Sequence, residues 1–411
     1  MDMDMDMDMV KQPKKLKAIA CAIIAIGLGF TAATNAISNV FAKKNPPLAY
    51  QLGWKTGPAL GEYAELRMKL GVMAKNPDKG VEPLALAALR KEAITPPALN
   101  VLALAAADRG EIERAYSLFA QSDLQSRRNV VAEVWLIEYL LKKDRVVDAI
   151  GKFDVAMRVS VEGQKALLPV LAMALREDKI FGQTKDVFRK KPVWLPALVE
   201  TAIALPDTQP NVARAVVIAG GLAGQQDAGG LSQNLFTGLV TQKQYDVARQ
   251  LYRTQVKGDQ GALTSIGFTP STISGSYAPI AWELKQNEKV QTEWELSRTG
   301  KTMLSVTAGN GANGPVARKL VFLKPGRYSL TIQAGKDDAY PMVPLDIALR
   351  CGHAQFPLMQ MAVTKQGPAR NEGDVLVPPD CNALIADIMV RGVAEGTTSR
   401  TYLNSIELKK L

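Results

Sequence analysis

Histidine and cysteine often carry metal or nucleophilic chemistry, and this chain has few of either. His353 is its single histidine, and Cys351 stands two positions earlier, in Cys351-Gly352-His353. One histidine excludes a multi-histidine metal site, and a serine–histidine–aspartate arrangement would have to use His353. A partial metal site is the alternative, but no further ligand types cluster beside these residues. We therefore interpret Cys351 as a disulfide cysteine beside a surface histidine.

Phosphate-binding and glycosidase chemistry are also weakly represented. Gly300-Lys301-Thr302 resembles the end of a phosphate-binding loop, but the earlier glycine that such loops need is replaced by Glu295. The stretch 309–314 contains Asn-Gly pairs typical of a hairpin loop, with a flexible binding loop as the alternative. The spacing of the acids in the β region selects no pair with glycosidase separation. These acids are Glu283, Glu293, Glu295, Asp337, Asp338 and Asp346. We expect no cofactor, no metal and no enzymatic activity.

Aromatic residues could instead form a platform on which a sugar ring stacks. The candidates for such a glycan platform are Trp282, Trp294, Tyr328 and Tyr340. Aromatic side chains also fill β-sandwich cores, so a core position is the alternative for each of them.

The N-terminal residues predict a membrane anchor. Residues 2–9 alternate Asp and Met, and a lysine cluster follows before residue 18. Residues 18–42 carry no charge and are long enough to cross a bilayer as a helix. We expect an uncleaved signal anchor, with a secretory signal cleaved after Ala36 as the alternative. The flanking lysines favour a cytoplasmic N-terminus, hence a single-pass inner-membrane protein with the bulk of the chain in the periplasm.

The cysteine pattern agrees with that compartment. Of the three cysteines, Cys21 lies in the membrane segment, whereas Cys351 and Cys381 lie in the β-rich region. In an oxidising compartment the latter two should form a disulfide, with two free buried thiols as the alternative.

A helical repeat pattern occupies residues 58–258. Ala115 and Phe119 recur as Ala149 and Phe153, with a period of about 34 residues. That period is typical of the tetratricopeptide repeat, a helix–turn–helix unit. Alanine lets two helices approach closely, and the aromatic residue one turn later fills the gap between repeats. We expect a solenoid of degenerate hairpins that binds a protein partner, with a pure spacer as the alternative.

Residues 265–411 change to the period of a β-strand. Tyr328, Leu330 and Ile332 alternate with polar residues, and Pro325-Gly326 before them predicts a β-hairpin. Eight to ten short strands with turn signals predict an all-β sandwich or jelly roll.

Two resemblances follow from these motifs. The segment from Leu323 to Leu330 and the closing strand Leu403–Leu408 resemble jelly-roll modules of the carbohydrate-binding type. The order of membrane segment, degenerate repeats and a β module starting near Pro279 resembles bacterial envelope proteins often encoded among exopolysaccharide genes. The resemblance implies an envelope context and no particular activity.

Charge adds one expectation about partners. The net charge is +10, with the basic residues scattered rather than gathered in a stripe with aromatics. Such a surface suits acidic polysaccharide or the inner membrane better than nucleic acid.

The sequence therefore predicts a multidomain chain and a membrane-anchored scaffold or adaptor in envelope or exopolysaccharide assembly or export. A structural accessory subunit of a membrane complex is the main alternative, and a glycan-active enzyme is a weaker one. The expected parts are a disordered cytoplasmic tail (1–17), a transmembrane anchor (18–42), a linker (43–57), repeats (58–258) and a β-sandwich (265–411).

Overall fold

The computed structural model describes residues 12–411 apart from 53–54, 75–77, 160, 223–227, 259, 336 and 394–397. The Asp-Met repeat at residues 2–9 lies outside the described residues. The chain forms two compact units, one ending at Leu167 and one running from Leu168 to Leu411. The division falls inside helix α9 (Val161–Ala174).

Helix α1 (Gln12–Lys44) is a long apolar helix. Its segment Ile24–Lys44 is long and apolar enough to cross a membrane, judged by length and composition. Its exposed apolar side chains are Ile24, Ile26, Leu28, Phe30, Ile37, Val40 and Phe41. Near its C-terminal end, the buried Ser38 hydroxyl donates a hydrogen bond of 3.2 Å to the carbonyl oxygen of Ala49.

Two short stretches differ from the sequence prediction. Residues 12–17, expected in the tail, lie within α1, and α2 (Pro46–Leu52) lies within the expected linker. Each of these helices has a proline near its start, Pro13 in α1 and Pro46 in α2. Proline fits the first turn of a helix, where its missing N–H has no intrahelical partner.

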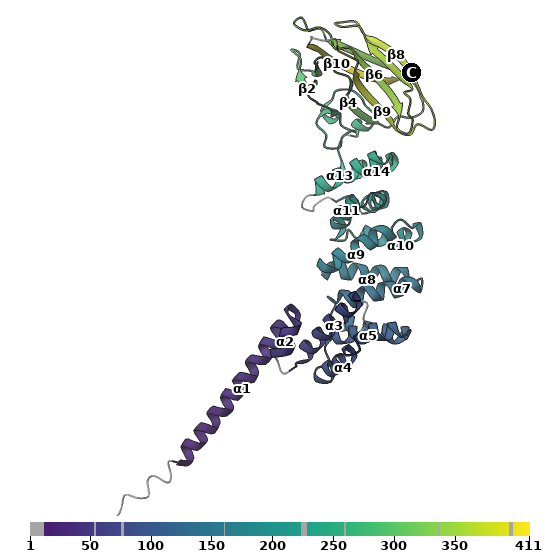
Figure 1. Ribbon diagram of the computed structural model, residues 1–411. Coiled ribbons are helices and arrows are strands. Elements are labelled where there is room, and N and C mark those ends of the chain that lie inside the picture. The colour runs from purple at the N-terminus through teal and green to yellow at the C-terminus, as the bar shows by residue number, and fades with distance from the viewer. Residues whose placement is uncertain are drawn as a thin grey trace, which may run out of the picture. The chain divides into compact units, whose positions relative to one another are not determined.

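Within each unit the remaining helices follow one another as helical hairpins (Figure 1). In the first unit they are α3 (Gly57–Met73), α4 (Val81–Lys91), α5 (Pro96–Asp108), α6 (Ile112–Gln125), α7 (Val130–Lys142) and α8 (Val146–Val159), with α9 (Val161–Ala174) at the division. In the second unit they are α10 (Asp178–Arg189), α11 (Leu195–Ala204), α12 (Gln209–Ile218), α13 (Ala228–Thr241), α14 (Tyr245–Gln255) and the short α15 (Pro270–Ile273).

The predicted repeat spacing matches the buried positions of this array. Ala115, Phe119, Ala149 and Phe153 are all buried. The turns that precede them are alike as well, because residues at equivalent positions, Gly110 and Asp144, have φ angles of 80° and 57°. Glycine adopts this left-handed conformation without strain, and aspartate tolerates it better than most residues. The same local chemistry therefore closes successive hairpins.

The C-terminal region is an antiparallel β-sandwich. Its strands are β1 (Glu283–Leu284), β2 (Val290–Leu296), β3 (Thr302–Ala308), β4 (Gly314–Val321), β5 (Gly326–Gly335), β6 (Leu345–Cys351), β7 (Met359–Val363), β8 (Asn371–Val377), β9 (Leu384–Val390) and β10 (Ser399–Lys410). Sheet A has the order β1-β4-β9-β6-β7, and sheet B has the order β2-β3-β10-β5-β8. Buried Leu330, Ile332, Ile347 and Ile388 are part of the core between them. The predicted fold class is confirmed.

Two predicted hairpins are wrong. The Pro325-Gly326 turn joins β4 to β5, and the glycine-rich stretch 309–314 joins β3 to β4. In each case the two strands belong to different sheets. Turn residues specify that the chain reverses, whereas the sheet that the next strand joins depends on distant partners.

The segment that connects α14 to β1 packs on the sandwich. Ile266 belongs to the sandwich core, and the backbone N–H groups of Leu320 and Phe322 donate to the carbonyls of Pro279 and Leu263, each at 2.7 Å. The Nζ group of the fully buried Lys319 donates to the backbone carbonyls of Ala262 and Ile280. The segment thus adds backbone and side-chain hydrogen bonds along β4.

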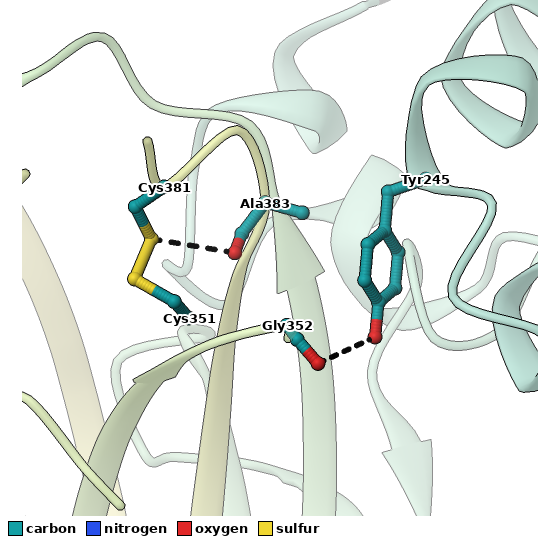
Figure 2. The surroundings of a disulfide bond; sticks show 5 residues. All are labelled: Tyr245, Cys351, Gly352, Cys381 and Ala383. Carbon is teal, nitrogen blue, oxygen red and sulfur yellow. Dashed lines mark hydrogen bonds between the residues drawn. A yellow bond between two sulfur atoms is a disulfide. The ribbon is translucent and has the colours of Figure 1, made fainter. Parts of the chain in front are cut away.

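The predicted disulfide between Cys351 and Cys381 is present, and it lies where α14 meets the sandwich (Figure 2). The Tyr245 hydroxyl donates a hydrogen bond of 3.0 Å to the carbonyl oxygen of Gly352. Asn382, next to Cys381, donates its amide to Asp246 at 2.8 Å. Residues adjacent to both cysteines therefore hold the start of α14.

Candidate functional site

The four predicted platform aromatics occupy different environments. Trp282 is buried, and its indole N–H donates to the carbonyl of Ile266 at 3.1 Å. Trp294 is partly buried and contacts the edge of Phe268, and Tyr328 is buried. These three rings pack against the sandwich core, and the burial of Trp282 and Tyr328 removes both as stacking platforms. Tyr340, at 44% exposure, is the one of the four that is open to a ligand.

A polar groove of about 450 Å³ lies on the outer face of sheet B. Its floor comes from strand alternation, since Leu330 and Ile332 on β5 point into the core and leave Thr331 and Gln333 outside. On β10, Leu403 and Ile406 are both buried because the strand register shifts between Leu403 and Ser405. The residues that line the groove are Ser297, Thr299, Lys301, Met303, Thr331, Gln333, Arg370, Asn404, Ser405, Glu407 and Lys409.

Positive charge predominates in this groove. Lys301, Arg370 and Lys409 line it together with Glu407, the only carboxylate among the described residues of its lining. The Lys409 ammonium lies 2.8 Å from the Glu407 carboxylate. Its hydrogen bond, together with the charges of Arg370 and Lys301, lowers the pKa of Glu407. The groove therefore attracts anions and offers hydroxyl and amide groups for hydrogen bonding.

An arginine between two tyrosines lies further along β10. The Arg400 guanidinium carbon is 5.6 Å from the centre of the Tyr340 ring and 5.9 Å from that of Tyr402. Its Nε donates to the Thr307 hydroxyl at 3.0 Å, which fixes the guanidinium in this place. Burial raises the pKa of Tyr402, against the effect of Arg400, so the ring remains a neutral phenol.

Sequence reasoning named Tyr340 and missed Tyr402, Arg400 and the groove. The signal for Tyr402 was present, because the buried Leu403 beside it requires Tyr402 to point outward. Along a strand, Tyr402 and Asn404 lie on one face at a spacing of roughly 7 Å, so Tyr402 and the groove share the outer face of β10.

A second candidate site lies in the first unit. A pocket of about 510 Å³ is lined by residues from α3, α5 and the α6–α7 connection, including Glu62, Lys69 and Arg128. Asn100 at its base donates to Asn129 at 2.9 Å and to Glu65 at 3.3 Å. Burial, followed by the charge of Glu65, raises the pKa of Glu62. The pocket therefore combines acidic, basic and amide groups.

The described part of the chain contains no cluster of metal-ligand residues. There, no group of three or more histidine, cysteine or acidic residues could hold an ion. Asp346, one of the acids considered for catalysis, is buried and pairs with Arg391 at 2.8 Å.

No family model and no curated protein matches the chain. Among solved structures, it is similar to a module described as "CBM4 structure and function", with 13% identity over 37% of this chain and 99% of that one (TM-score 0.27). The CBM22-1 xylan-binding domain from Paenibacillus barcinonensis Xyn10C has 17% identity over 36% and 93% of the two chains (TM-score 0.25). TmCBM61 in complex with β-1,4-galactotriose has 10% identity over 35% and 99% (TM-score 0.25). At these identities the likeness concerns the fold alone.

Proposed function

We propose that this chain is a membrane-anchored scaffold of the bacterial envelope. Helix α1 holds it in the inner membrane as a single-pass anchor, and the remainder lies in the periplasm. The helical array, with its tetratricopeptide-like spacing, binds a protein partner of envelope or exopolysaccharide assembly or export. The sandwich binds acidic polysaccharide, and the chain acts by binding rather than by catalysis.

The observation that carries the glycan part is the outer face of sheet B. A groove with basic excess lies on the same strand face as the ring of Tyr402, beside Arg400 and the exposed Tyr340. Carboxylates of an acidic polysaccharide would meet Lys301, Arg370 and Lys409, while sugar hydroxyls meet the amide and hydroxyl groups. Glycosidases use two carboxyl groups that flank the scissile bond, and Glu407 alone among the described lining residues supplies one.

Affinity measurement tests this part directly. The full-length protein in mild detergent is titrated with polygalacturonate or alginate and with neutral amylose. We expect binding to the acidic polymers, weakening with salt because the interaction is partly ionic. Tyr340→Ala and Arg370→Gln should weaken it. Phe356→Ala, which removes a ring that is 79% exposed and outside the groove, is the matched control. Equal affinity for amylose, or equal loss in the control, would refute glycan binding at this face.

The pocket between α3, α5 and the α6–α7 connection supports the partner-binding part. Its mixed charges and amides suit a polar peptide segment. Arg128 lines the pocket, whereas its exposed neighbour Arg127 does not, so the two form a matched pair. Purification of the full-length protein in mild detergent should recover polysaccharide synthesis or export components. Arg128→Glu should lose them and Arg127→Glu should retain them.

The exposed apolar surface of α1 favours one alternative, a structural accessory subunit of a membrane complex. Exposed Ile26, Leu28 and Phe30 could pack against integral membrane helices as well as against lipid. Co-purification of a stoichiometric membrane complex unrelated to polysaccharide, retained by both arginine variants, would select this alternative over the scaffold.

A further inference from the structure

A third polar cavity, which the proposed function does not use, lies where the α13–α14 turn meets the outer face of sheet A. It has a volume of about 390 Å³ and belongs entirely to the unit from Leu168 to Leu411. Strands β4 and β6 contribute Arg318 and Arg350, and the helical side contributes Lys243 and Tyr245. This volume falls within the usual range for small-molecule sites.

Two arginines at its base share one carboxylate. Arg318 donates to Asp387 from Nε at 2.6 Å and from Nη2 at 3.3 Å, and Arg350 donates to the same carboxylate from Nε at 3.3 Å. Strand register causes this arrangement. Asp387 on β9 lies opposite Arg318 on β4, and β9 also pairs with β6, the strand that carries Arg350. The Asp387 side chain is only 7% exposed.

The guanidinium groups retain unused donors. The Nη1 group of Arg318, and both Nη groups of Arg350, donate to no acceptor among the described residues. The two side chains line the cavity and are 29% and 24% exposed, so their donors are partly desolvated. Partly desolvated arginine donors of fixed orientation match the oxygens of carboxylate, sulfate or phosphate groups.

The charge balance of the cavity favours an anion. Lys243 and Lys285 add two positive charges to those of the two arginines, against Glu283 in the lining and Asp387 beneath it. The residual charge is positive, and hydrogen bonds to Asp387 orient both guanidinium groups.

The wall of the cavity is also held in place. Tyr245, the first residue of α14, donates to the carbonyl of Gly352, and the neighbouring Cys351 is tied to Cys381 (Figure 2). Gly352 admits the tyrosine ring at a distance that leaves no room for a Cβ atom. A preformed site loses little entropy when a ligand binds.

We propose that this cavity binds the oxyanion group of a small acidic molecule, with Arg350 and Arg318 as direct ligands and Lys243 as an outer charge. The site lies on sheet A, whereas the glycan groove lies on sheet B. Failure of one proposal therefore does not affect the other.

Calorimetric titration of the full-length protein in detergent tests the proposal. The probes are inorganic phosphate, sulfate and glucuronate, with neutral glucose as the control ligand. Arg350→Gln leaves the Arg318–Asp387 pair intact and should weaken binding by about tenfold or more. Lys243→Gln changes an exposed side chain and should weaken binding less, without a risk to folding. Arg391→Gln removes an arginine that is bound to Asp346 and lies outside the cavity lining, so it should leave binding unchanged.

The preferred probe identifies the source of the oxyanion. Tighter binding of phosphate or sulfate indicates an inorganic or esterified tetrahedral anion, and tighter binding of glucuronate indicates a sugar acid. Either result supports the site if Arg350→Gln and Lys243→Gln reduce it and Arg391→Gln does not. Absence of binding by all three probes, or undiminished binding by folded Arg350→Gln and Lys243→Gln proteins, would overturn it.

Discussion

Replacing Glu133 by Gln should stabilise the helical array at neutral and alkaline pH. Glu133 lies on α7 and is fully buried, and neither carboxyl oxygen has a hydrogen-bond partner among the described residues. Buried Asp123 on α6 adds a second carboxylate nearby, which is paired with Lys152 of α8. Burial, followed by the charge of Asp123, raises the pKa of Glu133 from 4.5 to about 7, against the attraction of Lys152.

The direction of the effect follows from proton linkage. Between pH 4.5 and pH 7 the folded chain keeps the Glu133 proton while the unfolded chain loses it. The folded state then binds more protons, so stability falls as pH rises through this window. A pKa shift of this size corresponds to about 3 kcal/mol of unfolding free energy, and the folded chain has lost all of it above pH 7. A neutral glutamine never incurs this loss.

Thermal unfolding by circular dichroism at pH 5 and pH 8 measures the effect. For a unit of this size, about 3 kcal/mol corresponds to a rise of roughly 6–12 °C in Tm. We expect that rise in Glu133→Gln at pH 8 and a much smaller one at pH 5. Glu138→Gln is the matched control on the same helix, because Glu138 is exposed and pairs with Lys142 only at the surface.

The reasoning fails if Glu133→Gln changes Tm equally at both pH values, or if Glu138→Gln reproduces the difference. Equal stability of the wild-type and Glu133→Gln chains at pH 8 would also contradict it, since it would mean that the buried carboxylate is solvated or paired.

Three further predictions concern the second unit. Gly352→Ala places a methyl group against the Tyr245 ring and should cost about 1–3 kcal/mol in urea unfolding. Reductant should lower the Tm of the wild-type chain, by the loss of roughly 2–4 kcal/mol, and leave a Cys351→Ser, Cys381→Ser double variant unchanged. Burial lowers the pKa of Lys319 from 10.5 to about 7, so the unfolded chain alone keeps this proton above pH 7 and stability rises toward pH 10. Lys319→Met should remove that rise, measured as the urea midpoint across this range.

Much of the fold was predictable because it depends on short-range patterns. The helical hairpins follow from alanine and aromatic residues one turn apart, and Gly110 with its equivalent Asp144 marks the turns. The sandwich follows from alternation such as that of Leu330 and Ile332 with polar neighbours. Strand β7 went unrecognised, because the methionine-rich run 359–363 lacks the β-branched alternation that predicts a strand.

The candidate sites were less accessible from the sequence. Tyr340 was named because its residue type suits a sugar, but its exposure, unlike the burial of Trp282 and Tyr328, required the packed core. The Arg318–Asp387–Arg350 cluster joins residues on three strands that are far apart along the chain. No local sequence pattern predicts such a cluster.

The amino-acid sequence by itself determined the apolar N-terminal helix, the change from helical to β periodicity and the cysteine pair. The helix and the change of periodicity depend on residues close together along the chain. The cysteine pair was predicted from the number and position of the cysteines. The tertiary structure alone decided which sheet each strand joins and which aromatic rings are buried. It also decided that the first residue of α14, Tyr245, contacts sheet A beside the disulfide. Those outcomes depend on contacts between segments that are distant in the sequence. The local pattern of one segment does not contain the free energy of such contacts.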